Sequence, residues 1–166
     1  MCVFTSLEHA FIWSGINEFR GFRDWCAKHY PGGGYPEKVD KLVAAYCRHH
    51  KLPIVEEDGV RCIVRPSGEK FSYLQYEGPS LKLAEEALGN GLLVCTTLYR
   101  SPRYGPGIIY HMVNLAHLGS RNAAILDNNF QPYEWDSRAR LEPRLKLAGR
   151  VWLIVVNRHG PPPPPK

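Results

Sequence analysis

The spacing of hydrophobic residues changes near residue 52, and this change constrains the fold more than any other feature of the sequence. Up to Lys51, apolar side chains recur at intervals of three and four residues, as in Phe19, Phe22 and Cys26, which is typical of amphipathic helices. Beyond it, short β-rich runs are separated by Asp-Gly and Ser-Gly pairs, which favour hairpins. Helices first and strands afterwards predict an α+β fold with a mainly antiparallel sheet.

The expected elements follow from this spacing and from the glycines and prolines that interrupt it. Helices are expected at residues 5–14, 18–28, 36–51, 81–88 and 137–148, and strands at residues 54–55, 61–64, 71–76, 92–98, 108–118, 123–126 and 151–156. The triple glycine at 32–34 ends the second helix in a loop. It lacks the lysine and the preceding strand of a phosphate-binding loop, so we expect no cofactor there.

A single domain is expected over residues 1–158, with a polyproline tail at 159–166. The chain has 166 residues, 44% of them hydrophobic, which suffices for one sizeable core. Five consecutive prolines favour a stiff extended tail, and such a segment is also a ligand type for aromatic-lined grooves.

Charge and cysteine content exclude several classes of protein. No run of eighteen apolar residues and no secretory leader is present, so we expect no membrane span and a cytoplasmic location. The five cysteines are an odd number at irregular spacings, which fits reduced thiols better than a disulfide framework. The net charge of +5 is spread among sixteen acidic residues, which argues against nucleic acid as a partner.

One set of residues in the sequence could support nucleophilic catalysis by cysteine. Such catalysis needs a thiolate, an imidazole within hydrogen-bonding reach, and a polar group that orients the imidazole. Cys2 precedes the first expected helix, His111 lies in the strand at 108–118, and Asp127 follows the strand at 123–126. Asn128 and Asn129 are alternatives to Asp127 for the orienting role.

These residues resemble a known family. The stretch Cys2-Val3-Phe4-Thr5-Ser6-Leu7 is similar to the nucleophile segment of papain-like cysteine peptidases, in particular the bacterial C39-like branch. A histidine on a sheet strand followed sixteen residues later by an aspartate at a strand end is also similar to that branch. The resemblance implies a papain-like fold, with N-terminal helices packed on the sheet. It also implies Cys2 as nucleophile, His111 as general base and acid, and Asp127 as the orienting residue.

Three features of the sequence bear on whether this site is complete. The family places a glutamine shortly before the cysteine as an oxyanion-hole donor, and here only Met1 precedes Cys2, so the sequence is a fragment, another donor serves, or the site is degenerate. Thr5-x-x-Glu8 resembles a capping box, which predicts that the first helix begins at Thr5 and leaves Cys2 outside it. A tight loop at 119–122 would pair Asn114 with Asp127, so a triad requires another register or a bulge.

A zinc site is the alternative interpretation of the residues in the two helices expected at 18–28 and 36–51. Cys26-x-x-His29 and Cys47-x-x-His50 repeat one spacing and would give four ligands. Both cysteines, however, continue apolar stripes and are expected to face the core.

The sequence therefore predicts a cysteine peptidase or amide hydrolase that acts on a peptide or protein and needs no cofactor. A catalytically inactive papain-like module for binding or structure, and a zinc-stabilised helical pair, are the alternatives.

Overall fold

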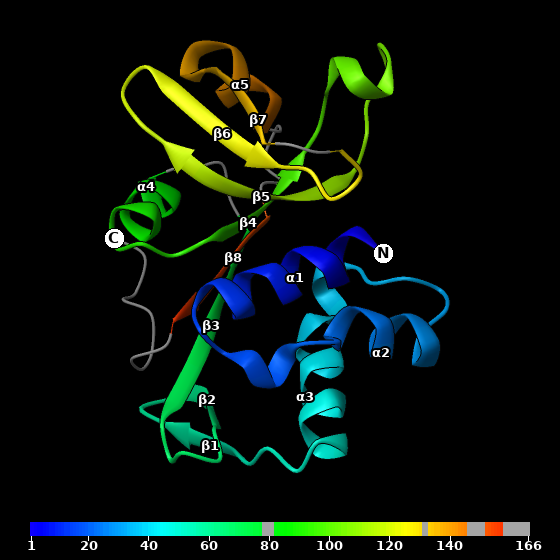
Figure 1. Cartoon of the computed structure of the whole chain (residues 1–166), viewed down its shortest axis with the longest axis vertical. Helices are drawn as coiled ribbons and strands as arrows, with labels where there is room; N and C mark the ends of the chain where they lie inside the picture. Colours follow the sequence, from blue (N-terminus) through cyan, green and yellow to red (C-terminus); the bar gives the residue numbers. More distant parts are fainter. Residues whose placement is uncertain (78–81, 131–132, 146–151, 158–166) are drawn as a thin grey trace.

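The computed structural model of the chain describes residues 1–77, 82–130, 133–145 and 152–157 (Figure 1). These residues form five α-helices and an antiparallel sheet of eight strands, which confirms the α+β class. The helices are α1 (Cys2–Trp13), α2 (Phe22–His29), α3 (Val39–His49), α4 (Lys82–Gly89) and α5 (Arg138–Leu145). The strands are β1 (Ile54–Glu57), β2 (Val60–Val64), β3 (Lys70–Glu77), β4 (Val94–Leu98), β5 (His111–Leu118), β6 (Asn122–Leu126), β7 (Glu134–Ser137) and β8 (Trp152–Asn157).

The last strand of the chain lies in the middle of the sheet. The strand order is β1-β2-β3-β8-β4-β5-β6-β7, and all neighbours are antiparallel. β8 pairs with β3 on one side and with β4 on the other, so it joins the N-terminal strands to the strands that follow α4.

Helices cover both faces of the central strands. Along β8, Ile154 and Val156 belong to the apolar cluster formed with α1, α2 and α3, whereas Val155 belongs to the cluster formed with α4 and α5. This alternation is the two-residue period of a strand buried on both faces. Figure 1 shows α1, α2 and α3 grouped together and α4 and α5 apart from them.

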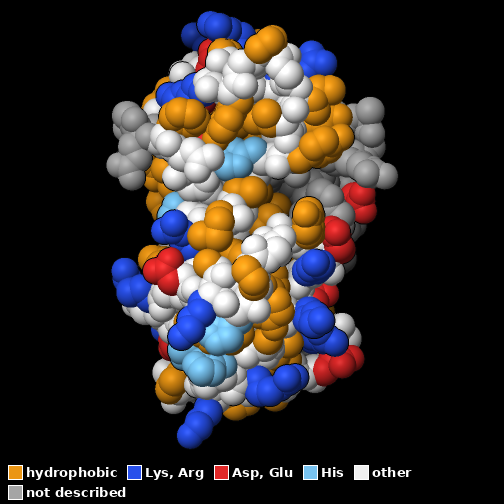
Figure 2. All heavy atoms as spheres, turned by 90° about the vertical axis from the view of Figure 1, so that its right-hand side faces the viewer, with side chains coloured by type: hydrophobic (Ala, Val, Ile, Leu, Met, Phe, Trp, Pro, Cys, Tyr) orange, Lys and Arg blue, Asp and Glu red, His pale blue; other side chains and the backbone are white. Residues whose placement is uncertain are grey.

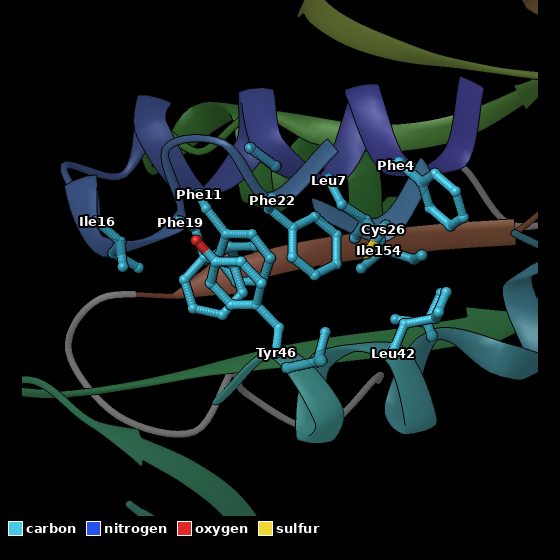
Figure 3. Close-up of a cluster of buried hydrophobic side chains, with 14 of the residues drawn as sticks. Phe4, Leu7, Phe11, Ile16, Phe19, Phe22, Cys26, Leu42, Tyr46 and Ile154 are labelled. Carbon is cyan, nitrogen blue, oxygen red and sulfur yellow. The ribbon is translucent and has the colours of Figure 1, made fainter. Parts of the chain in front are cut away.

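The larger core is built on aromatic rings between α1, α2 and α3 (Figure 3). Phe19 lies at its centre, with ring centroids 3.9 Å from Phe11, 5.4 Å from Phe22 and 4.9 Å from Tyr46. All four side chains are buried. These tilted contacts stabilise the helical layer beyond the area that it buries, and they hold α1, α2 and α3 together.

The expectation that α1 begins at Thr5 is wrong. The helix begins at Cys2, and the Thr5 hydroxyl donates to the carbonyl oxygen of Met1. Glu8 does not close a capping box: its carboxylate accepts hydrogen bonds from the main-chain N–H groups of Gly21 and Arg23, at the start of α2. The carboxylate therefore caps a neighbouring helix, a contact that local spacing does not reveal.

Other elements also differ from the expectation. The helix predicted over 36–51 begins with a separate 3₁₀ turn (Pro36–Lys38), and the strand predicted over 108–118 begins at His111. The single helix predicted over 18–28 is divided into a 3₁₀ turn (Asn17–Phe19) and α2, because Gly21 adopts a left-handed conformation with φ of 88°. β7 was not predicted, since its four residues contain two acids and no run of β-branched side chains.

Other predictions fall outside the described residues. The end of the helix expected at 137–148, the first residue of the strand expected at 151–156 and the polyproline tail belong to this group. Among the described residues, no helix is both long and apolar enough to cross a membrane.

Candidate active site

Three separate elements bring Cys2, His111 and Asp127 together. Cys2 is the first residue of α1, His111 is the first residue of β5, and Asp127 directly follows β6. His111 Nε2 lies 2.8 Å from Asp127 Oδ1. The thiol of Cys2 interacts with the same imidazole, and this interaction lowers the pKa of Cys2 and raises that of His111. The three predicted residues therefore lie together at one site.

Polar contacts beside the site dock α1 on β4 and β5. The Ser6 hydroxyl donates to the carbonyl oxygen of Met112 at 3.1 Å, and the Asn114 amide donates to the carbonyl oxygen of Ser6 at 2.9 Å. The Cys95 thiol also donates to the Ser6 carbonyl. Ser6, Cys95 and Asn114 are fully buried, where unpaired polar groups would be costly. Because Ser6 lies one turn after Cys2 and Met112 follows His111, these bonds fix the thiol relative to the imidazole.

A β-bulge in β5 brings Asp127 to the histidine. Leu118 pairs with Ala123 and His117 with Ala124, but the register then shifts, so that Leu115 pairs with Ile125. Ala116 is the extra residue. If Ala116 were paired and the register did not shift, Asp127 would face Asn114. The shifted register, continued by one residue, instead places Asp127 opposite Val113, whose side chain lies on the same side of β5 as that of His111. The requirement for a bulge, expected from the sequence, is thus met.

The surroundings of Cys2 favour its thiolate. Burial alone would raise the pKa of Cys2, but four interactions outweigh it: the hydrogen bond with His111, the N–H of Met112, the charge of His111 and the charge of the N-terminal amine. Together they lower the pKa of Cys2 to about 7. The position at the start of α1 acts in the same direction, because the helix dipole stabilises negative charge there.

His111 is held in the state that suits this thiolate. Burial would lower its pKa, but the hydrogen bonds with Cys2 and Asp127 and the charge of Asp127 raise the pKa of His111 above its ordinary value. Asp127 is 1% exposed, and its carboxylate also accepts bonds from the Tyr104 hydroxyl and the N–H of Asn129. A buried carboxylate satisfied in this way stabilises an imidazolium next to the sulfur.

A pocket of about 590 Å³ opens beside the thiol and the imidazole. Its wall includes Cys2, His111, Met112, Thr97, Tyr110, Tyr35 and the glycines at 32–34. Tyr110 and Tyr35 are 75% and 53% exposed, so they form an apolar rim. Figure 2 shows hydrophobic side chains across the middle of this side of the molecule, with Lys and Arg side chains mainly over its lower half. The glycine loop therefore borders the site, a position that no residue pattern indicated.

The two asparagines after Asp127 make other contacts. The Asn128 amide donates to the carbonyl oxygen of Cys2 at 3.3 Å, and the Asn129 amide donates to the Tyr104 hydroxyl at 2.9 Å. The Nε2–H group of His111 donates to the carboxylate of Asp127, so neither asparagine takes the orienting role. Tyr104 itself was not expected at the site. Its loop, rich in proline and glycine, carried no signal of a side chain that reaches Asp127.

The four residues of the alternative zinc site lie in different surroundings. Cys26 and Cys47 are fully buried in the aromatic core, and burial raises the pKa of each thiol to about 12. His29 Nδ1 lies 2.8 Å from the carbonyl oxygen of Trp25, and the ring of His50 packs on Tyr46. Over the described ranges, no cluster of three or more His, Cys, Asp or Glu side chains is placed to hold a metal ion.

The chain is thus an α+β protein with a Cys-His-Asp arrangement at the edge of an apolar pocket. Comparison with known proteins adds no family to this description: the sequence matches no protein-family model, and no curated protein is significantly similar to it.

Proposed function

We propose that the protein is a cysteine hydrolase of the papain-like type, which cleaves a peptide or amide bond through Cys2, His111 and Asp127. The observation that supports this most strongly is that Cys2, whose pKa His111 lowers, lies beside an imidazole that is hydrogen-bonded to the buried Asp127. A nucleophilic cysteine at the start of a helix, a base on an adjoining strand and a carboxylate behind the base fulfil the three roles of a catalytic triad.

In the proposed reaction, the Cys2 thiolate attacks the carbonyl carbon and forms a C–S bond. The imidazolium of His111 then protonates the leaving nitrogen, the C–N bond breaks, and an amine departs from a thioester. Water next attacks the thioester while His111 accepts its proton, and the acid and the free thiol are released. Asp127 keeps the imidazole oriented and stabilises its positive form through both steps.

The start of α1 offers donors for the oxyanion. The first hydrogen bond of the helix joins the N–H of Thr5 to the carbonyl oxygen of Met1, so the N–H groups of Cys2, Val3 and Phe4 lack the partner that an interior turn would supply. Such groups, next to the nucleophile, suit a developing negative charge. They are an alternative to the upstream glutamine that the papain-like pattern uses.

The pocket suits a polypeptide better than a small charged substrate. Its rim consists of exposed aromatic side chains, Tyr35 and Tyr110, and its volume of about 590 Å³ is sufficient for several substrate atoms beyond the scissile bond.

The pH dependence of alkylation tests the proposal directly. Iodoacetamide should modify Cys2 with a midpoint near pH 7, in line with its lowered pKa. In the His111→Ala variant, the burial penalty remains and the hydrogen bond is lost, so the midpoint should rise to about 8.5 or higher, the range of an ordinary thiol. Cys26, Cys47 and Cys95 should react slowly, since burial raises the pKa of each.

A matched control uses the other histidine of β5. His117 is exposed and packs against Trp135, at the opposite end of the strand. His117→Ala should leave the midpoint of Cys2 unchanged. If wild-type Cys2 titrates like a free thiol, the proposal is refuted. If Cys2 is activated but peptide libraries show no cleavage, an inactive binding module is the better description.

A further inference from the structure

We infer that Tyr104 is a positioning residue that holds Asp127 in the orientation needed by His111. This inference rests on the proposed function, since it concerns how the same site is kept in order. Tyr104 ends a short 3₁₀ turn (Pro102–Tyr104) in the loop between β4 and β5. The turn begins with a side-chain cap, in which the Ser101 hydroxyl accepts from the N–H of Arg103 at 3.3 Å.

The hydroxyl of Tyr104 lies 3.0 Å from both carboxylate oxygens of Asp127. It therefore donates along the axis of the carboxylate and restrains its rotation. Asp127 Oδ1, the same oxygen that meets His111, also accepts from the N–H of Asn129 at 3.0 Å. Rotation of the carboxylate would break all three contacts together.

The direction of the tyrosine bond is fixed by a further residue. The Asn129 amide donates to the Tyr104 oxygen at 2.9 Å, which leaves the tyrosine proton to point at Asp127. Burial, together with the charge of Asp127, raises the pKa of Tyr104 to about 12 despite the opposing bond from Asn129. The hydroxyl consequently stays protonated, and remains a donor, throughout the working pH range.

The ring of Tyr104 also packs beside the imidazole. Its centroid lies 5.3 Å from that of His111 and 5.2 Å from that of Phe130, which meets it edge-on. Phe130 in turn carries the guanidinium of Arg103 over its ring. The ring thus helps to exclude water from the His111–Asp127 bond, and a hydrogen bond shielded from water is the stronger for it.

The test is Tyr104→Phe, which keeps the ring and removes only the hydroxyl. Without this restraint the carboxylate rotates away from His111, the imidazolium is less stabilised, and the midpoint of Cys2 alkylation should rise by about one pH unit. With a cleaved peptide in hand, kcat should fall about tenfold while KM stays within about twofold. Asn129→Ala should shift the midpoint in the same direction by less.

Tyr76→Phe is the matched control, because Tyr76 lies on β3 and packs against the apolar cluster formed with α4 and α5. It should leave the midpoint unchanged, and thermal unfolding verifies that each variant is folded. The inference is overturned, while the proposed function stands, if the midpoint of Cys2 alkylation in Tyr104→Phe is unchanged. It is also overturned if the midpoint falls because the Asp127 carboxylate, without the tyrosine hydrogen bond, stabilises the imidazolium of His111 more strongly. A wild-type Cys2 without a lowered midpoint refutes both, since no ion pair would then exist to be positioned.

Discussion

The close approach of the glycine loop to α1 leads to a test of how the pocket wall is built. A Cβ atom added at Gly34 would clash with Cε1 of Phe4 and would lie 2.9 Å from its Cδ1. Phe4 is fully buried, so its ring has no solvent-filled space into which it could turn. Gly34→Ala must therefore displace the ring or the loop.

The expected cost is that of overpacking a core, about 1–3 kcal/mol in the free energy of unfolding. For a chain of this length, that corresponds to a fall in Tm of roughly 3–9 °C. Gly32→Ala is the matched control in the same loop. A Cβ at Gly32 meets no atom within 4 Å, and its backbone is not left-handed, so the change should stay within about 0.5 kcal/mol of the wild type.

Urea titrations of both variants, monitored by circular dichroism, measure the difference. Shortening the ring by Phe4→Leu should reduce the penalty of Gly34→Ala by about 1 kcal/mol in a double-mutant cycle, since the clashing ring atoms are gone. If Gly34→Ala proves as stable as Gly32→Ala, or if the two substitutions show no coupling, then the loop does not rest on Phe4 as described.

A further prediction concerns the ion pair between Glu18 and Arg65. Arg65 Nε lies 2.9 Å from Glu18 Oε1, and although burial would raise the pKa of Glu18, the bond and charge of Arg65 hold it below its usual value. The stabilising contribution of Glu18 is thus present above its unfolded pKa and is lost as pH falls through its lower folded pKa. In Glu18→Gln, the free energy of unfolding should therefore depend less on pH between about pH 5 and pH 3 than in the wild type. Equal slopes in the two proteins would contradict this prediction.

Helices and strands were predictable where the spacing of apolar or β-branched residues alone determines them. The helical stripe of α3 and the β-branched run of β4 fall where the sequence placed them. Features that depend on distant partners were not predictable. Glu8 follows Thr5 at the spacing of a capping box, yet tertiary packing turns its carboxylate to the start of α2. Local propensity is a weak guide where such a partner is available.

The candidate site shows the same division. The residue types and order indicated Cys2, His111 and Asp127, because the chemistry of a nucleophilic cysteine requires them. The register of the sheet could be stated only as a condition, since the position of a bulge depends on the packing of both strands. Tyr104 and the loop at 32–34 lie at the site only because of the tertiary structure, and no residue pattern in the sequence indicates that proximity.

The docking of α1 on β5 has a consequence for how the protein loses function under stress. The sulfur belongs to the helical layer and the imidazole to the sheet, and the bonds of Ser6 and Asn114 join the two layers beside them. A slight separation of these layers would disconnect the ion pair while each helix and strand kept its own hydrogen bonds. In mild denaturant, the heightened reactivity of Cys2 should consequently disappear before the far-ultraviolet dichroism changes, so the thiol serves as an early indicator of loosening between the layers.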